Sequence, residues 1–177
     1  MSTWEELESV KRLKYRYLRY LDTKQWESLA ALLTDDCTGA YDSGRFSCNG
    51  RAEIMAFLER SMGTHELLSV HHVHHPEVDL LDAKNARGAW YLEDTVFDYR
   101  SRVRVDGTAI YADRYRKVDG AWRIAHTGYR RIWYRAQKLD DSGILERRSM
   151  FDAAERQRNA RAQHVAEDGA VFAAWQD

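Results

Sequence analysis

Apolar residues recur at steps of three and four through the first part of the chain, and this spacing predicts three helices. The first helix is expected over residues 4–21, after a capping box formed by Thr3 and Glu6. Thr23 is expected to cap a second, short helix, and Asn49 a third. The apolar stripe of the first helix consists of Leu7, Val10, Leu13, Tyr17 and Leu21.

The other predicted elements are strands, because β-branched and aromatic residues replace the helical spacing. Two short runs, 37–42 and 44–48, precede the third helix and are joined at Ser43-Gly44. Longer segments follow at 67–82, 86–103, 108–118 and 121–135, divided by Lys84-Asn85, Asp106-Gly107 and Asp119-Gly120. The two Asp-Gly pairs are typical of hairpin turns. These segments predict a curved antiparallel sheet with one face covered by the three helices, an α+β fold.

The pattern changes again after Arg135, where the aromatic strands end. Residues 140–165 are highly charged and only thinly apolar, which predicts a helix packed on the surface or on another subunit. We therefore expect one domain over residues 1–135, with 136–177 as its C-terminal helical extension.

Composition narrows the class of partner. The 177 residues include 27 Lys and Arg against 28 Asp and Glu, so no overall field attracts nucleic acid or an anionic membrane. Cys37 and Cys48 are too few for a disulfide framework, and the charged N-terminus lacks the apolar run of a signal peptide. A cytoplasmic protein whose specificity comes from a local site is expected.

Four histidines, His71, His72, His74 and His75, occur within five positions of one predicted strand. Side chains alternate along a strand, so His71 and His75 are expected on one face and the other two on the opposite face. Four histidines cannot then share one metal ion, and a pair would need further ligands that no nearby residue supplies, so no metal is predicted. Two interpretations stay open: surface histidines with local hydrogen bonds, or one histidine acting as a general base.

Three further polar residues occupy unexpected positions. Asp94 shares a face with Trp90 and Leu92, where a carboxylate is costly unless it is paired with a cation or with an imidazole. Tyr17 lies on the apolar stripe, so its hydroxyl needs a core partner or a substrate. Asp22 ends the first helix, where the helix dipole disfavours a carboxylate unless it has another role or begins the next turn.

The last predicted strand alternates arginines with aromatic residues. Tyr129, Arg131 and Trp133 are expected to share one face. Such alternation can bind nucleic acid, but in an inner strand of a neutral protein it favours an Arg131 that binds a substrate oxygen or pairs with a buried acid. The candidates for substrate contact are Trp90, Leu92, Tyr129 and Trp133.

Taken together, Y-x-x-x-x-D at the end of the first helix, H-x-x-H-x-P, W-Y-L-E-D, Y-x-D-x-Y-x-K-x-D-G-x-W and T-G-Y-x-R resemble the SnoaL-like proteins of the nuclear transport factor 2-like superfamily. The pattern is most similar to that of the bacterial bile-acid 7α-dehydratases, with scytalone dehydratase and hexachlorocyclohexane dehydrochlorinase more distant. The resemblance covers roughly residues 8–134. It implies a cone-shaped fold around a deep apolar pocket, with no cofactor.

The resemblance also implies a set of catalytic residues and a reaction. Its working positions fall on Tyr17, Asp22, His71, Asp94 and Arg131. These residues imply a cofactor-free lyase of the dehydratase type that acts on a hydrophobic polycyclic or aromatic alcohol. His71, oriented by Asp94 or Asp22, would remove a proton while Tyr17 and Arg131 stabilise an oxygen.

Several alternatives remain open at the level of sequence. A carbon–carbon lyase that releases formaldehyde or another small aldehyde from lignin-derived aryl diols would need similar residues. Isomerases, and binding modules such as oxygenase small subunits, also use this architecture. A homo-oligomer, trimer or dimer, is expected because the outer face of the sheet is rich in Tyr and Trp.

Overall fold

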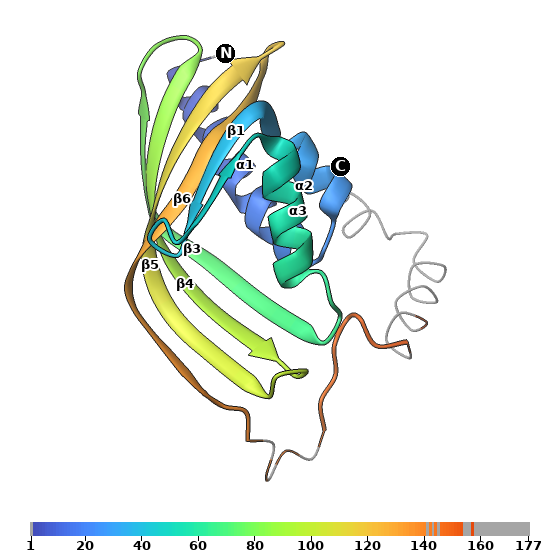
Figure 1. Ribbon diagram of the computed structural model, residues 1–177. Coiled ribbons are helices and arrows are strands. Elements are labelled where there is room, and N and C mark those ends of the chain that lie inside the picture. The colour runs from blue at the N-terminus through green and yellow to red at the C-terminus, as the bar shows by residue number, and fades with distance from the viewer. Residues whose placement is uncertain (1, 141, 143, 145, 154–156, 158–177) are drawn as a thin grey trace. The chain divides into compact units, whose positions relative to one another are not determined.

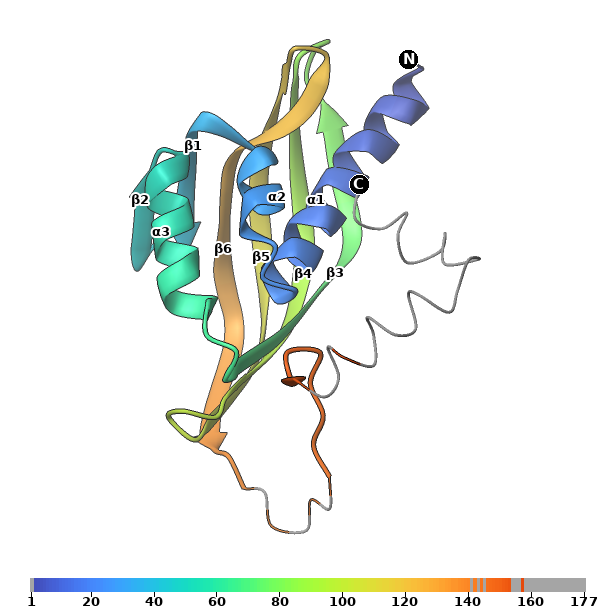
Figure 2. The same ribbon diagram turned by 90° about the vertical axis from the view of Figure 1, so that its right-hand side faces the viewer.

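Three helices lie against one face of a strongly bent sheet (Figures 1 and 2). They are α1 (Thr3–Asp22), α2 (Trp26–Ala31) and α3 (Arg51–Met62). This computed structural model describes residues 2–140, 142, 144, 146–153 and 157. The three predicted helices and their placement on the sheet are confirmed.

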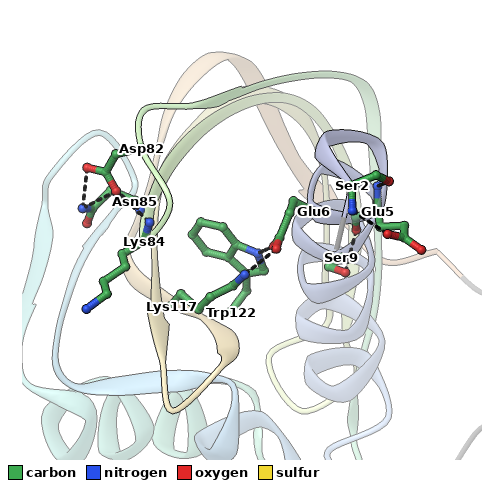
Figure 3. Close-up of polar contacts among 9 residues, drawn as sticks. All are labelled: Ser2, Glu5, Glu6, Ser9, Asp82, Lys84, Asn85, Lys117 and Trp122. Atoms are coloured by element: carbon green, nitrogen blue, oxygen red, sulfur yellow. Dashed lines mark hydrogen bonds and ion pairs between the residues drawn. The ribbon is translucent and has the colours of Figure 1, made fainter.

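The capping box of α1 is one residue earlier than predicted. Ser2, not Thr3, is the N-cap: its hydroxyl accepts from the Glu5 backbone N–H (3.3 Å), and the Glu5 carboxylate accepts from the Ser2 backbone nitrogen (2.6 Å). Figure 3 shows why Glu6 is not available, since its carboxylate accepts bonds from Lys117 Nζ and Trp122 Nε1, each at 2.5 Å. Glu6 therefore ties α1 to the sheet.

The other two predicted caps are also wrong. Thr23 ends α1, where its backbone N–H and its hydroxyl both donate to the Arg19 carbonyl. α2 begins after Gln25 without a side-chain cap. The N-cap of α3 is Gly50, at φ 88°, a conformation that glycine adopts readily and asparagine less so.

The sheet has the order β2-β1-β6-β5-β4-β3. Its strands are β1 (Leu33–Tyr41), β2 (Phe46–Asn49), β3 (Leu67–Leu80), β4 (Asn85–Asp98), β5 (Val103–Val118) and β6 (Ala121–Lys138). The antiparallel meander from β3 to β6 is confirmed, as is the turn at Asp119-Gly120. β1 pairs with β6 in parallel, so the sheet is mixed and not wholly antiparallel.

The turn between β3 and β4 is held by one aspartate. Figure 3 shows Asp82 accepting from the backbone nitrogens of Lys84 (2.7 Å) and Asn85 (2.9 Å). An aspartate that bonds the backbone two and three residues later is a common way to fix a turn. The predicted division at Lys84-Asn85 is thus displaced by about one residue, since Asn85 already begins β4.

The predicted turn at Asp106-Gly107 is wrong, because the pair lies inside β5. The hairpin turns instead at 99–102, and Gly107 pairs with Asp94 of β4. A Cβ atom at Gly107 would lie 2.8 Å from Nη1 of Arg131. The glycine therefore leaves room for the Arg131 guanidinium as it reaches from β6 across β5.

A bulge in β6 reverses the alternation of its side chains. Thr108 pairs with Trp133 but Ala109 pairs with Arg131, so Ile132 is the extra residue. The prediction that Trp133 shares a face with Tyr129 and Arg131 is therefore wrong. Trp133 is half exposed and lines a hollow on the outer face of the sheet.

A second irregularity changes the face of His75. The register between β3 and β4 shifts between His74 and Glu77, and His75 has a positive φ of 50°. Its ring lies 5.7 Å from that of Tyr91, on the outer face beside His74. The prediction that His75 shares a face with His71 is therefore wrong.

Beyond β6 the description is partial. The chain divides into two compact units, Met1–Leu139 and Asp140–Asp177, and all elements named above lie in the first. The predicted boundary after Arg135 falls inside β6. Of the helix predicted over 140–165, residues 146–152 are not helical, and most of the remainder lies outside the described residues. Among the helices that the structure describes, none is long and apolar enough to cross a membrane.

Candidate active site

A cavity of about 510 Å³ lies among α1, α3 and the inner face of the sheet, a size within the range of small-molecule sites. Aromatic side chains dominate its wall, with a few charged ones among them. The lining residues are Tyr17, Leu21, Tyr41, Asp42, Arg45, Phe46, Phe57, Leu58, Arg60, Ser61, Met62, His71, Val105, Tyr111, Tyr129, Arg131 and Tyr134. Such a wall suits an apolar molecule with a few polar groups.

His71 reaches this cavity from β3, and its ring is bonded to Asp22 at the end of α1. His71 Nδ1 lies 2.6 Å from Asp22 Oδ1. The same carboxylate accepts from the Ser69 hydroxyl (2.8 Å) and from the His71 backbone nitrogen (2.9 Å). Three bonds thus fix both the carboxylate and the imidazole. They also offset the unfavourable placement of a carboxylate at the C-terminus of a helix.

The bond to Asp22 also sets the tautomer of His71. An ionised carboxylate can only accept, so Nδ1 must donate. In the neutral ring Nε2 then carries the lone pair and can accept a proton. The side chains of His71 and Asp22 are 10% and 19% exposed, so the pair is shielded from most solvent.

Asp94 does not orient His71, although the two residues are directly opposite on β3 and β4. Its carboxylate instead binds Arg131 in a bidentate pair, Nη1 to Oδ1 and Nη2 to Oδ2, the latter at 2.8 Å. Burial disfavours the charged guanidinium, but the hydrogen bonds and negative charge of Asp94 outweigh it and raise the pKa of Arg131. Arg131 is therefore a permanent cation at the cavity wall.

Buried tyrosines supply hydroxyl groups to the cavity. The Tyr17 and Tyr41 hydroxyls lie 3.2 Å apart, and the Tyr111 and Tyr129 rings meet edge to face with centroids 5.4 Å apart. Burial raises the pKa of Tyr17, Tyr41 and Tyr111 well above the usual value, so these hydroxyls stay neutral. Neutral hydroxyls can donate hydrogen bonds to an oxygen that gains negative charge.

A fully buried ion pair supports these tyrosines from behind. Lys14 Nζ lies 2.8 Å from Asp113 Oδ2 and 3.3 Å from the centroid of the Tyr111 ring. Burial lowers the pKa of Lys14, and the charge of Asp113 opposes that shift. Asp113 Oδ2 also accepts from the Tyr115 hydroxyl, which itself accepts from Trp90 Nε1. The pair therefore fixes the base of the cavity.

Sequence analysis did not identify this pair, although its pattern contains a signal. Lys14 is four residues after Val10 and three before Tyr17, so it lies on the apolar stripe of α1. Asp113 shares a strand face with Tyr111 and Tyr115 in the same way. A charged residue within an apolar stripe indicates either a buried partner or a functional role.

The structure brings together most, but not all, of the predicted site residues. Tyr17, His71, Arg131 and Tyr129 line the cavity, while Asp22 and Asp94 stand behind His71 and Arg131 as their partners. The predicted substrate contacts Trp90 and Leu92 are core residues, each 1% exposed, and do not line it. Trp133 is excluded by the β6 bulge, and Tyr134 lines the cavity in its place.

Sequence analysis also missed the residues that close the cavity on the side of α3. Phe57 and Arg60 come from α3 and Arg45 from the turn before β2. No local pattern shows that β1 pairs with β6, the pairing that brings these elements to the cavity. Within the described residues, no three His, Cys, Asp or Glu side chains form a group suited to hold a metal ion.

Solved structures with the same architecture are numerous, and three illustrate the range. A protein of Novosphingobium aromaticivorans provisionally named a scytalone dehydratase has 23% identity and a TM-score of 0.70 over 82% of this chain and 97% of its own. A hexachlorocyclohexane dehydrochlorinase of Novosphingobium barchaimii has 16% identity and a TM-score of 0.69 over 82% and 97%. An NTF2-like protein of unknown function from Pseudomonas putida has 21% identity and a TM-score of 0.61 over 73% and 88%.

These similarities show the fold that the motifs predicted, the nuclear transport factor 2-like α+β fold. The family is shown by the sequence itself. The model of the SnoaL-like domain matches residues 2–128, which include the three helices α1, α2 and α3 and five of the six strands in full. The chain therefore belongs to the SnoaL-like domain family.

Proposed function

We propose that this protein is a cofactor-free lyase of the dehydratase type that acts on a hydrophobic polycyclic or aromatic alcohol. The observation that carries the proposal is the bond of His71 Nδ1 to Asp22 at 2.6 Å. His71 also lines a largely apolar cavity. A carboxylate that holds one ring nitrogen leaves the other free to take a proton, and such general bases contribute about 10²–10⁴-fold to rate.

The proposed step is the elimination of water. His71 Nε2 removes a proton from the carbon next to the carbinol, the C–H electron pair becomes the new double bond, and the C–O bond breaks with its electrons on oxygen. The departing oxygen takes up a proton from the His71 imidazolium and leaves as water, so His71 returns to its neutral form and the enzyme retains no net proton. Arg131 and the Tyr17 hydroxyl stabilise the charge that develops on that oxygen.

Names of similar structures agree with this class of reaction. The scytalone dehydratase and dehydrochlorinase names both describe eliminations, although identities of 23% and 16% extend only the fold to this chain. The motif likeness to bile-acid 7α-dehydratases favours a steroid-like alcohol. Each of these supports the proposal without identifying the substrate.

A substrate panel tests the proposal. Purified protein is incubated with hydroxysteroids and with diaryl-propanoid diols, and products are followed by mass spectrometry. Loss of water from a panel member is the expected result, whereas release of formaldehyde would favour the carbon–carbon lyase. Binding of a panel member without any conversion would identify a binding module instead.

Variants assign the activity to the base. His71→Ala is expected to lower kcat/KM by about 10²–10⁴-fold. Asp22→Asn is expected to lower kcat/KM by a similar factor, mainly through kcat and not through KM. His72→Ala is the matched control, because His72 is exposed on the opposite face of the same strand. Unchanged turnover in His71→Ala would remove the proposed base.

We also propose that the protein forms a homo-oligomer through the outer face of the sheet. Four large apolar side chains on the outer face of the sheet or at the β6 bulge are 46–55% exposed: Val70, Tyr91, Ile132 and Trp133. Large exposed apolar groups of this kind are usually covered by a partner. Light scattering after size exclusion would measure the mass, and a monomer at micromolar concentration would contradict this proposal.

A further inference from the structure

Two arginines from separate elements lie together at one side of the cavity. Arg45 lies in the turn between β1 and β2, and Arg60 is in the last turn of α3. Both line the 510 Å³ cavity and also an adjoining hollow of about 370 Å³. Because both arginines are exposed residues that line two joined spaces, they stand at the mouth and not at the base.

The two guanidinium groups retain capacity for an anion. Arg45 Nη1 lies 3.8 Å from Asp42 Oδ2, which is too long for a hydrogen bond. Arg60 has no ion pair within 4 Å among the residues that the structure describes. Arg131, by contrast, directs two nitrogens to Asp94. A guanidinium with unused donors matches a carboxylate in geometry and charge.

Acidic neighbours cancel this charge only in part. Asp42 lines the cavity and faces Arg45 at the distance given above. Glu53 lines the adjoining hollow, but its Oε2 accepts the Asn49 backbone N–H at 2.9 Å. Because Arg131 is paired with Asp94, the other charged residues that line the cavity are Arg45, Arg60 and Asp42, which leaves one positive charge in excess there.

An aromatic row connects the arginines with the reacting groups. The Phe46 and Phe57 rings lie 5.3 Å apart, and the Phe57 and Tyr41 rings stack at 5.0 Å. The Tyr41 hydroxyl then meets that of Tyr17 at 3.2 Å. A flat apolar molecule lying along this row would have one end at the arginines and the other at the tyrosine hydroxyls.

We propose that Arg45 and Arg60 form a carboxylate-binding rim, and that the substrate is an anionic polycyclic or aromatic alcohol whose carboxylate stays at the mouth while its carbinol reaches His71. This inference rests on the proposed lyase function for the role of His71, but not for the binding of the anion. The alternative is that both arginines are only solvated surface residues. In that case Arg60 would serve to stabilise the C-terminus of α3 through the helix dipole.

A pair of unreactive probes tests the rim directly. Pyrenebutyrate and its primary amide share the same apolar body and differ in charge, and their affinities are measured by fluorescence titration for the wild type and for R45Q/R60Q. The wild type is expected to bind the carboxylate about tenfold more tightly than the amide, as a charge-assisted hydrogen bond implies. The double variant is expected to lose that preference while its affinity for the amide stays the same.

Arg130→Gln is the matched control, because it removes the same charge from an exposed position of β6 that does not line the cavity. It should leave the preference intact. Equal affinity of the wild type for the two probes, no binding of pyrenebutyrate up to its solubility limit, or a preference that survives in R45Q/R60Q would each overturn the rim. His71→Ala should keep the preference, so loss of the lyase function and loss of the rim are observed separately.

Discussion

Removing the cation from the Arg131–Asp94 pair should destabilise the fold strongly, because it leaves a buried carboxylate without a partner. The Asp94 and Arg131 side chains are 2% and 16% exposed, so solvent screens the pair little. Removing one partner of a buried ion pair costs about 3–5 kcal/mol. We therefore expect Arg131→Met to lower the free energy of unfolding by about 3–5 kcal/mol.

A double variant separates the pair from the rest of the core. In R131M/D94L both charges are replaced by apolar groups of similar length, so no buried charge remains unpaired. Such replacements are often neutral or stabilising, and the double variant should lie within about 1.5 kcal/mol of the wild type. Both variants should nevertheless lack turnover, because both lack the Arg131 cation that stabilises the departing oxygen in the proposed step.

Urea unfolding followed by tryptophan fluorescence measures these changes, since the chain contains 6 tryptophans. Arg130→Met is the control at the neighbouring, exposed position. This expectation is contradicted if Arg131→Met is as stable as the control, or if the double variant is no more stable than the single one. Either result would mean that the Asp94 charge is not buried against Arg131.

Two further predictions concern the backbone and the buried tyrosines. Gly107→Ala should cost about 1–3 kcal/mol in urea unfolding, since its Cβ would lie 2.8 Å from Arg131 Nη1, and an unchanged midpoint would contradict that contact. Stability should also fall at alkaline pH: an unfolded tyrosine ionises near pH 10 and a buried one does not, so the unfolded state binds fewer protons above that pH. For each such tyrosine the free energy of unfolding then falls by about 1.4 kcal/mol per pH unit. The lowered pKa of Lys14 offsets part of this fall. Equal urea midpoints at pH 10 and pH 11 would contradict the expected loss. The buried tyrosines are Tyr17, Tyr41, Tyr111 and Tyr115.

Local patterns were sufficient to predict the helices, the meander and the positions of His71, Asp22 and Arg131. These depend on periodicities of a few residues, on the Asp119-Gly120 turn and on the short motifs on which the family resemblance rested. Asp106-Gly107 has the same sequence as that turn but a different structural role, since its glycine makes space for Arg131. A dipeptide cannot distinguish these cases without the strand that passes beside it.

The missed features depend on contacts between distant segments. The parallel pairing of β1 with β6 joins residues about ninety positions apart, and only this pairing places the α3 side of the cavity next to Arg131. The bulge at Ile132 exchanged Trp133 for Tyr134, because one extra residue reverses every later side chain of a strand. The choice of Asp22 over Asp94 as the partner of His71 was likewise open, since Asp94 is the direct neighbour on the adjacent strand.

Nitrogen NMR of the imidazole rings tests, without a substrate, whether Asp22 holds the His71 ring with Nε2 free to accept a proton in the cavity. In the pH range where the ring is neutral, we expect a protonated Nδ1 and an unprotonated Nε2 for His71, with the Nδ1 proton exchanging more slowly than that of exposed His72. A proton on Nε2 in the neutral ring, or an Nδ1 proton exchanging as fast as that of His72, would show that Asp22 does not hold His71 as a general base.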